Sequence, residues 1–212
     1  MKKIKIAQIG TSRFSHGVSI WRSLRKQSDV FEVVGYALPE GEREKFPEWA
    51  NDYDPDFGKL LTRDPDYTKR VFAIGRGGKK PRKDFGTWGE CKGYMGFFFD
   101  ELFAVTESFP EGTDLCDVKS ILLDFAEQFD ASDDQGTWFD KIKAIADKYG
   151  YASDMKAYKA DPTVFKGSVA DVSSFMRLSV TGRLSSPDMY EVMQILGKDR
   201  VKARLTEYAN SL

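Results

Sequence analysis

"SVADVSSFMRLSVTGRLSSPDMYEVMQILGKDRVKARL", residues 168–205, is the stretch of this 212-residue chain that decides its fold. Its first part, residues 168–180, combines apolar residues with many small ones, which allows helices to approach closely. Thr-Gly-Arg at 181–183 interrupts this helical segment, and Gly197 ends the segment that follows. In the last segment apolar residues recur at helical spacing, at Val201, Leu205 and Tyr208. The stretch therefore predicts helices that pack against one another.

A possible binding site lies at the interruption between these helices. Ser186 is placed to cap the next helix, with Pro187 at its first position and Asp188 in its first turn. Arg177 and Arg183 lie nearby along the chain and offer planar guanidinium groups. Together with the free N–H groups of a helix start, they suit a phosphate or the edge of a base. The alternative is an ordinary capped pair of helices without a ligand.

The chain upstream of this stretch also has helical periodicity. Proline follows a capping aspartate at Asp54-Pro55 and at Asp64-Pro65, an order typical of helix starts. Two core-facing stripes follow, one of Leu115, Val118, Ile121, Leu122, Phe125 and Phe129 and one of Phe139, Ile142, Ile145, Ala146 and Tyr149. We predict an all-α region over residues 47–212, with subdomains at about 47–110 and 111–212.

The first 46 residues have a different pattern. Residues 4–10 and 31–38 read as buried strands, and the segment between them holds a small-residue loop and a short helix. A strand, a glycine-bearing loop, a helix and a strand make a βαβ unit, whose first turn can bind a phosphate. The fold class we predict is therefore mainly α, a helical bundle preceded by a truncated Rossmann-like βαβ unit over residues 1–46.

The N-terminal unit suggests a second possible function. "IKIAQIGTSRFSHG" resembles the start of the Gfo/Idh/MocA oxidoreductases, and this resemblance implies NAD or NADP at the loop. Gly10 can serve as the first glycine of the dinucleotide fingerprint, Ser12 stands where the second is expected, and Glu40 could contact the ribose. The alternative function is thus an NAD(P)-dependent oxidoreductase or an inactive remnant of one.

Overall composition limits the classes of partner. The chain is 41% hydrophobic and has a net charge of −1, which indicates a globular protein whose total charge attracts neither nucleic acid nor membrane. The charges are segregated, however, because residues 76–83 hold five cations and no anion, whereas residues 111–134 hold eight acidic residues and only Lys119. Local patches could therefore orient a polyanion, although each run could equally be a solvated surface. We expect neither DNA nor a membrane as a partner.

Cysteine and histidine content argues against a metal site. Cys91 and Cys116 form no CxxC motif, and His16 is the single histidine, so a zinc site is not expected. Two isolated cysteines fit a reducing compartment, and no stretch approaches the ~18 apolar residues of a membrane span. We expect a cytoplasmic, monomeric protein.

Four segments between about Trp49 and the end of the chain carry a resemblance to a known family: "KKPRKDFGTW", "FFFDELF", "TWFDKIKAIADKYGYASDMKAYK" and "FKGSVADVSSFMRLSVTGRLSSPDMYEVMQILGKDRVKARL". Over this range the chain resembles the C-terminal, anticodon-binding part of bacterial glutamyl-tRNA synthetases, which are class I glutamate–tRNA ligases. The resemblance implies an α-helical cage that grips the anticodon end of glutamate tRNA.

The same resemblance implies roles for individual residues. Arg177 matches the family arginine that precedes a Thr-Gly pair, and Ser186, Pro187 and Met189 fall on positions that line the anticodon pocket. Ser174 stands where the family can place an aromatic residue. The basic run is a candidate for phosphate contacts, which supply most of the salt-sensitive affinity for RNA; its members are Arg76, Lys79, Lys80, Arg82 and Lys83.

Activation of glutamate would need motifs that this sequence does not contain. The resemblance implies an ATP site with a His-x-Gly-His signature and a Lys-Met-Ser-Lys-Ser type loop, and neither occurs in the 212 residues. "RGGKKP" does not have the spacing or the hydroxyl residue of a Walker loop. We therefore expect the chain alone to bind tRNA without catalysis and without a cofactor of its own. ATP and Mg²⁺ would belong to a catalytic domain, and NAD(P) only to the oxidoreductase alternative.

Overall fold

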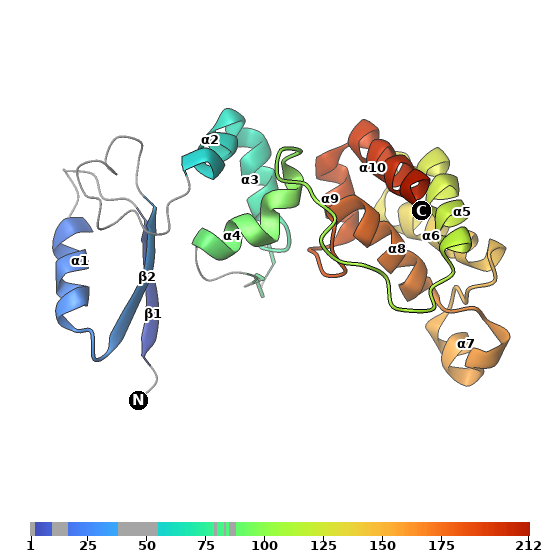
Figure 1. Cartoon of the computed structure of the whole chain (residues 1–212), viewed down its shortest axis with the longest axis horizontal. Coiled ribbons are helices and arrows are strands. Elements are labelled where there is room, and N and C mark those ends of the chain that lie inside the picture. Colours follow the sequence, from blue (N-terminus) through green and yellow to red (C-terminus); the bar gives the residue numbers. More distant parts are fainter. Residues whose placement is uncertain (1–2, 10–16, 38–54, 79, 83, 85–87) are drawn as a thin grey trace. The chain divides into compact units, whose positions relative to one another are not determined.

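The computed structural model describes residues 3–9, 17–37, 55–78, 80–82, 84 and 88–212. Contacts divide the chain into two compact units. The first comprises Met1–Lys69 and Gly78–Gly96, and the second comprises Arg70–Gly77 and Phe97–Leu212. Figure 1 shows the elements of both units with their labels.

The first unit begins with the predicted βαβ arrangement. Its elements are β1 (Ile4–Ile9), α1 (Gly17–Lys26) and β2 (Phe31–Ala37). The two strands are parallel, with Ile4 opposite Phe31 and Ile9 opposite Ala37. Among the described residues no further strand joins this sheet, so the unit is the short Rossmann-like fragment that the sequence predicts.

Three short helices follow the βαβ unit along the described part of the chain. They are α2 (Pro55–Arg63), α3 (Pro65–Ala73) and α4 (Trp88–Met95). Both α2 and α3 begin at the predicted prolines. The Oδ1 atom of Asp64 accepts a hydrogen bond of 2.9 Å from the Tyr67 N–H, which confirms Asp64 as a cap. Asp54 lies outside the described residues.

The second unit is a helical bundle. Its helices are the 3-10 turns η2 (Gly96–Phe98) and η3 (Pro162–Val164), and α5 (Leu115–Gln128), α6 (Gln135–Lys148), α7 (Met155–Ala160), α8 (Val169–Thr181), α9 (Met189–Leu196) and α10 (Lys198–Ser211). Helix α10 packs against α5, α8 and α9, while α6 packs against α5 and α8. Figure 1 shows α7 projecting from this bundle. No helix in the described part of the chain is long and apolar enough to cross a membrane.

The predicted stripes on α5 and α6 form much of the core. The buried members are Val118, Ile121, Leu122, Phe125, Phe129, Ile142, Ile145 and Ala146. Leu115 was wrongly assigned to the core, because it lies in the first turn of α5 and is 46% exposed. Phe139 and Tyr149 are only half-buried, since they lie at the border of the packed stripe of α6. Gly150 has φ +82 and follows the C-cap Tyr149, a position where glycine commonly ends a helix.

The predicted start of α9 needs a correction. The helix begins at Met189, and its N-cap is Asp188, whose Oδ1 accepts a hydrogen bond of 3.0 Å from the Glu191 N–H. Ser186 is therefore not the cap, and Pro187 is not the first helical residue. The hydroxyl of Ser186 instead donates to the Pro187 carbonyl at 2.9 Å, whereas the longer-reaching carboxylate of Asp188 satisfies the helix start.

An extended segment after η2 presses on the C-terminal end of α8. Gly182 ends this helix with φ +75, and a Cβ atom there would lie 2.0 Å from the carbonyl oxygen of Ala104. The Thr106 N–H donates to the Gly182 carbonyl at 3.0 Å. In Figure 1 this green segment passes α9 and α8 before it reaches α5. Glycine at 182 is thus required by both the backbone conformation and the close contact.

Gly182→Ala is expected to destabilise the protein by about 3 kcal/mol, because the positive φ and the clash with Ala104 each cost energy. Gly112→Ala is the matched control, since Gly112 has φ +86 but no heavy atom within 4 Å of an added Cβ. The control should lose only about 1–2 kcal/mol. Urea unfolding of both variants measures the difference, and equal losses would contradict the close contact.

Candidate nucleic-acid interface

Arg177 lies on α8 at the end that faces the loop to α9. Its side chain is half-buried, and its guanidinium makes no hydrogen bond or ion pair with the residues that the structure describes. Burial lowers the pKa of Arg177, and the Asp188 carboxylate partly opposes this shift. The group remains a cation at neutral pH, because an arginine titrates far above that range. A half-buried cation without a hydrogen-bond acceptor is well suited to bind an acceptor from a ligand.

The loop between α8 and α9 is fixed by hydrogen bonds at both of its sides. The Thr181 hydroxyl donates to the Arg177 carbonyl, with Oγ1 at 2.8 Å from the carbonyl oxygen. Oγ1 of Thr181 also lies 3.2 Å from the carbonyl oxygen of Arg183. The Leu184 N–H donates to Oε2 of Glu107 at 2.6 Å. These hydrogen bonds fix the conformation of the loop without a ligand. The loop between α8 and α9, together with Arg177 at the end of α8, is called the platform below.

The structure brings the predicted pocket residues together on this platform. Arg183 and Ser186 are half-buried, whereas Pro187 and Met189 are buried. The Ser186 hydroxyl lies 3.2 Å from the Met189 sulfur, so these two side chains are in contact. The Asp188 carboxylate at the start of α9 attracts the Arg177 guanidinium near the end of α8. Whether these residues contact a base remains a prediction.

Arg204 of α10 contacts the same end of α8, a role that was not among the predictions from the sequence. It is only 4% exposed, and its Nη1 donates to the Val180 carbonyl at 2.8 Å. Its Nη2 lies 2.8 Å from Oδ1 of Asp100, and its guanidinium stacks 3.8 Å from the ring centre of Phe103. A signal existed, because Arg204 lies three residues after Val201 and so on the buried face of the helix.

The basic run has a more structural role than its sequence predicts. Arg76 Nη1 donates to the carbonyls of Phe72 and Ile74, each at 3.2 Å, and so caps the end of α3. Arg82 Nε donates to Asp84 at 2.8 Å, and this hydrogen bond raises the pKa of Arg82. The members Lys79 and Lys83 lie outside the described residues.

Lys80 differs from the two arginines of the run. Its side chain is exposed and has no partner among the residues that the structure describes. The phosphate-contact prediction for the described part of the run therefore rests chiefly on Lys80.

The residues predicted for a dinucleotide are not part of the described chain. Gly10, Ser12 and Glu40 all lie outside the described residues, so NAD(P) binding remains a prediction from the sequence. Within the described ranges, no cluster of three or more histidine, cysteine, aspartate or glutamate side chains is placed to hold a metal ion.

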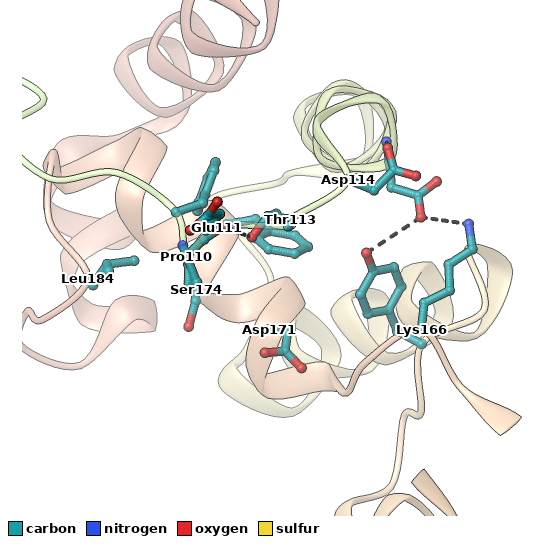
Figure 2. A pocket seen from close by; sticks show the side chains of 13 residues that line it. Pro110, Glu111, Thr113, Asp114, Lys166, Asp171, Ser174 and Leu184 are labelled. Carbon is teal, nitrogen blue, oxygen red and sulfur yellow. Dashed lines mark hydrogen bonds and ion pairs between the residues drawn. The ribbon is translucent and has the colours of Figure 1, made fainter. Parts of the chain in front are cut away.

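A cavity of about 630 Å³ lies beside α8 in the second unit. One wall is the 109–114 segment, and a second wall is α8 with Asp171, Ser174 and Phe175. Leu184 of the α8–α9 loop also lines the cavity. In the view of Figure 2, Leu184, Pro110 and Ser174 lie on one side, with Lys166 and Asp114 on the other.

The far wall of the cavity is held by an ion pair and a tyrosine. Lys166 Nζ lies 2.6 Å from Oδ2 of Asp117, and the Tyr151 hydroxyl donates to the same oxygen at 3.5 Å. Burial raises the pKa of Tyr151 to about 12, with a smaller contribution from the Asp117 carboxylate. The phenol is therefore neutral at physiological pH and can act as a donor.

The C-terminal helices belong to a recognisable class of domain. Residues 164–209 match the family model described as an anticodon binding domain. This range contains α8, α9 and most of α10, and therefore the whole platform around Arg177. The class defined by the fold and the site is thus an anticodon-binding domain.

Similar proteins extend this result over most of the chain. The chain is 38% identical to the glutamate–tRNA ligase of Acetivibrio thermocellus over 86% of its own length, and 42% identical to that of Sorangium cellulosum over 76%. It is 36% identical over 87% of its length to that of Clostridium perfringens SM101. It spans about a third of the length of these relatives, namely 34%, 28% and 34%. Its C-terminal region is an anticodon-binding region of the glutamate–tRNA ligase type, as the sequence predicts.

Arg204→Met should destabilise the chain by about 2–4 kcal/mol, because it leaves the buried Val180 carbonyl without a donor. Asp100→Asn should cost less than about 1 kcal/mol, since the Asp100 side chain is 63% exposed and its ion pair is screened by solvent. Denaturant unfolding of the two variants compares these losses. An Asp100 variant as unstable as the Arg204 variant would show that the ion pair, and not the carbonyl contact, holds the end of α8.

Proposed function

We propose that this chain binds the anticodon end of a tRNA, specifically glutamate tRNA, as part of glutamyl-tRNA aminoacylation. The observation that carries the proposal is Arg177, a half-buried guanidinium on the platform of an anticodon-binding domain that makes no hydrogen bond or close ion pair with the described residues. Partial burial of a guanidinium without hydrogen-bond acceptors costs free energy, which the more distant Asp188 carboxylate offsets only in part, and a ligand that supplies an acceptor would remove this cost.

The recognition follows from the geometry of the platform. Arg177 would use its planar fork on a base edge, because two parallel N–H groups can discriminate between bases. Arg183 would add a second cation, and the buried Pro187 and Met189 would offer an apolar surface to an unstacked base. Lys80 would contact phosphate, which adds affinity without sequence preference.

The relatives are named as glutamate–tRNA ligases, and this name directs the proposal to glutamate tRNA. The described platform binds RNA in this proposal and performs no bond-making step, so ATP and Mg²⁺ are not assigned to it. We expect a cytoplasmic monomer that does not use DNA or a membrane as a partner. A binding titration with glutamate tRNA and an unrelated tRNA at several salt concentrations tests the function directly. Equal, weak binding of both RNAs would contradict it.

Arg177→Ala should weaken binding of glutamate tRNA by about 1–3 kcal/mol and have a much smaller effect on an unrelated tRNA, because the guanidinium reads a base edge. Fluorescence anisotropy with labelled tRNAs measures both affinities, and thermal unfolding verifies that the variant is folded. Equal losses on both RNAs would reassign Arg177 to a phosphate contact.

Lys80→Ala should leave the preference for glutamate tRNA unchanged and lower the slope of log affinity against log salt by about 1, because one phosphate contact is lost. Lys119→Ala is the control, since Lys119 lies in the acidic 111–134 segment and should not change the slope. Titrations between low and moderate salt give the slopes. An unaltered slope for the Lys80 variant would remove this residue from the interface.

A further inference from the structure

We propose that the cavity beside α8 receives one unpaired nucleobase that carries an exocyclic amino group, and that Phe109 is the ring on which this base stacks. This inference rests on the proposed RNA-binding function and assigns a residue outside the family-matched range 164–209. Phe109 belongs to the extended segment that precedes α5, so a distant part of the chain would complete the binding site.

The cavity has a suitable size and an aromatic wall. Its volume of about 630 Å³ lies within the usual range of small-molecule sites, about 300–1,000 Å³. Phe109 is half-buried and meets Phe175 edge-to-face, with ring centres 5.3 Å apart. Tyr208 meets Phe109 in the same manner at 5.9 Å. These two contacts hold the Phe109 ring in one orientation, which lowers the entropic cost of stacking a base on it.

Ser174 keeps the space beside this ring open. Its hydroxyl donates to the Ala170 carbonyl at 2.9 Å, so its small side chain is turned back onto its own helix. Arg177 lies three residues further along α8 and therefore on the same face. Arg177 does not itself line the cavity, but it lies one helical turn from Ser174. A base in the cavity and the guanidinium that the proposed function assigns to base recognition would therefore act on one segment of RNA.

The charge of the lining selects the part of a nucleotide that can enter. Its carboxylates are Glu111, Asp114, Asp117 and Asp171, and its single cation, Lys166, is paired with Asp117. Such a lining repels phosphate, so the phosphates would remain outside the cavity. Carboxylates accept hydrogen bonds from amino groups, as aspartate and glutamate do from cytosine N4. The cavity therefore favours cytosine or adenine over uracil.

Affinity measurements with the full chain and a labelled anticodon stem-loop of glutamate tRNA test the role of the ring. Phe109→Leu retains an apolar side chain but removes the stacking face, and it should weaken binding about 5- to 100-fold. Phe139→Leu is the matched control, because Phe139 is also half-buried but lies on α6 and does not line the cavity. This control should change affinity less than about twofold.

Substitutions at Ser174 test whether the base occupies the cavity beside α8. Ser174→Leu fills the cavity without adding a ring and should weaken binding about tenfold or more, whereas Ser174→Ala leaves the space open and should bind like the natural chain. Both changes are compatible with a helix, and urea unfolding establishes that each variant is folded.

Changes in the RNA identify the base. Stem-loops with one abasic position each should include one whose loss of affinity is strong for the natural chain and much smaller for Phe109→Leu, because the two changes remove the same contact. Exchange of that cytosine or adenine for uracil or inosine should also weaken binding, since the amino group is replaced by a carbonyl.

The possible failures are distinguishable. If the natural chain binds no stem-loop, the proposed RNA-binding function itself is wrong. If it binds well but Phe109→Leu and Ser174→Leu bind equally well, or no abasic position is coupled to Phe109, the cavity is not a base site and only this inference is overturned.

Discussion

The contact of Gly182 with the extended 103–107 segment is the constraint on which the candidate site depends. No side chain fits at residue 182, because a Cβ atom would lie 2.0 Å from the Ala104 carbonyl oxygen. Thr106 and Glu107 bind the backbone on either side of Arg183, and Arg204 holds the preceding carbonyl of Val180. The end of α8 is thus held by two elements that are distant from it in the sequence, and binding residues on it are already positioned.

This arrangement explains how a cation can remain half-buried without a hydrogen bond to the described residues. The packing of α8 against α5, α6 and α10 fixes the backbone at Arg177, whose side chain is half-buried. The stability of the bundle offsets the partial desolvation of this group, which the proposed function assigns to binding. Strain or incomplete pairing at a site, compensated by the surrounding packing, is common where a protein binds a ligand.

Charge is separated over short distances in the same bundle. The cavity beside α8 is lined by carboxylates, although Arg177 lies on the same helix only one turn from Ser174. Helix caps explain part of this acidity, since Asp114 caps α5 and Asp171 binds the backbone N–H of Ser168 at the start of α8. Residues required for helix formation thereby also create an acceptor-rich pocket beside a cationic platform.

The sequence by itself determined the helical fold, the short βαβ unit and the position of the loop between α8 and α9, because periodicity, proline and glycine act locally. It also placed Arg177 correctly at the end of a helix. Only the tertiary structure decided which side chains are free to bind. Arg76 and Arg82 are used to cap and to pair, Arg204 is a buried anchor, and Phe109 lies against α8, since these contacts join residues that are far apart in the sequence or depend on burial.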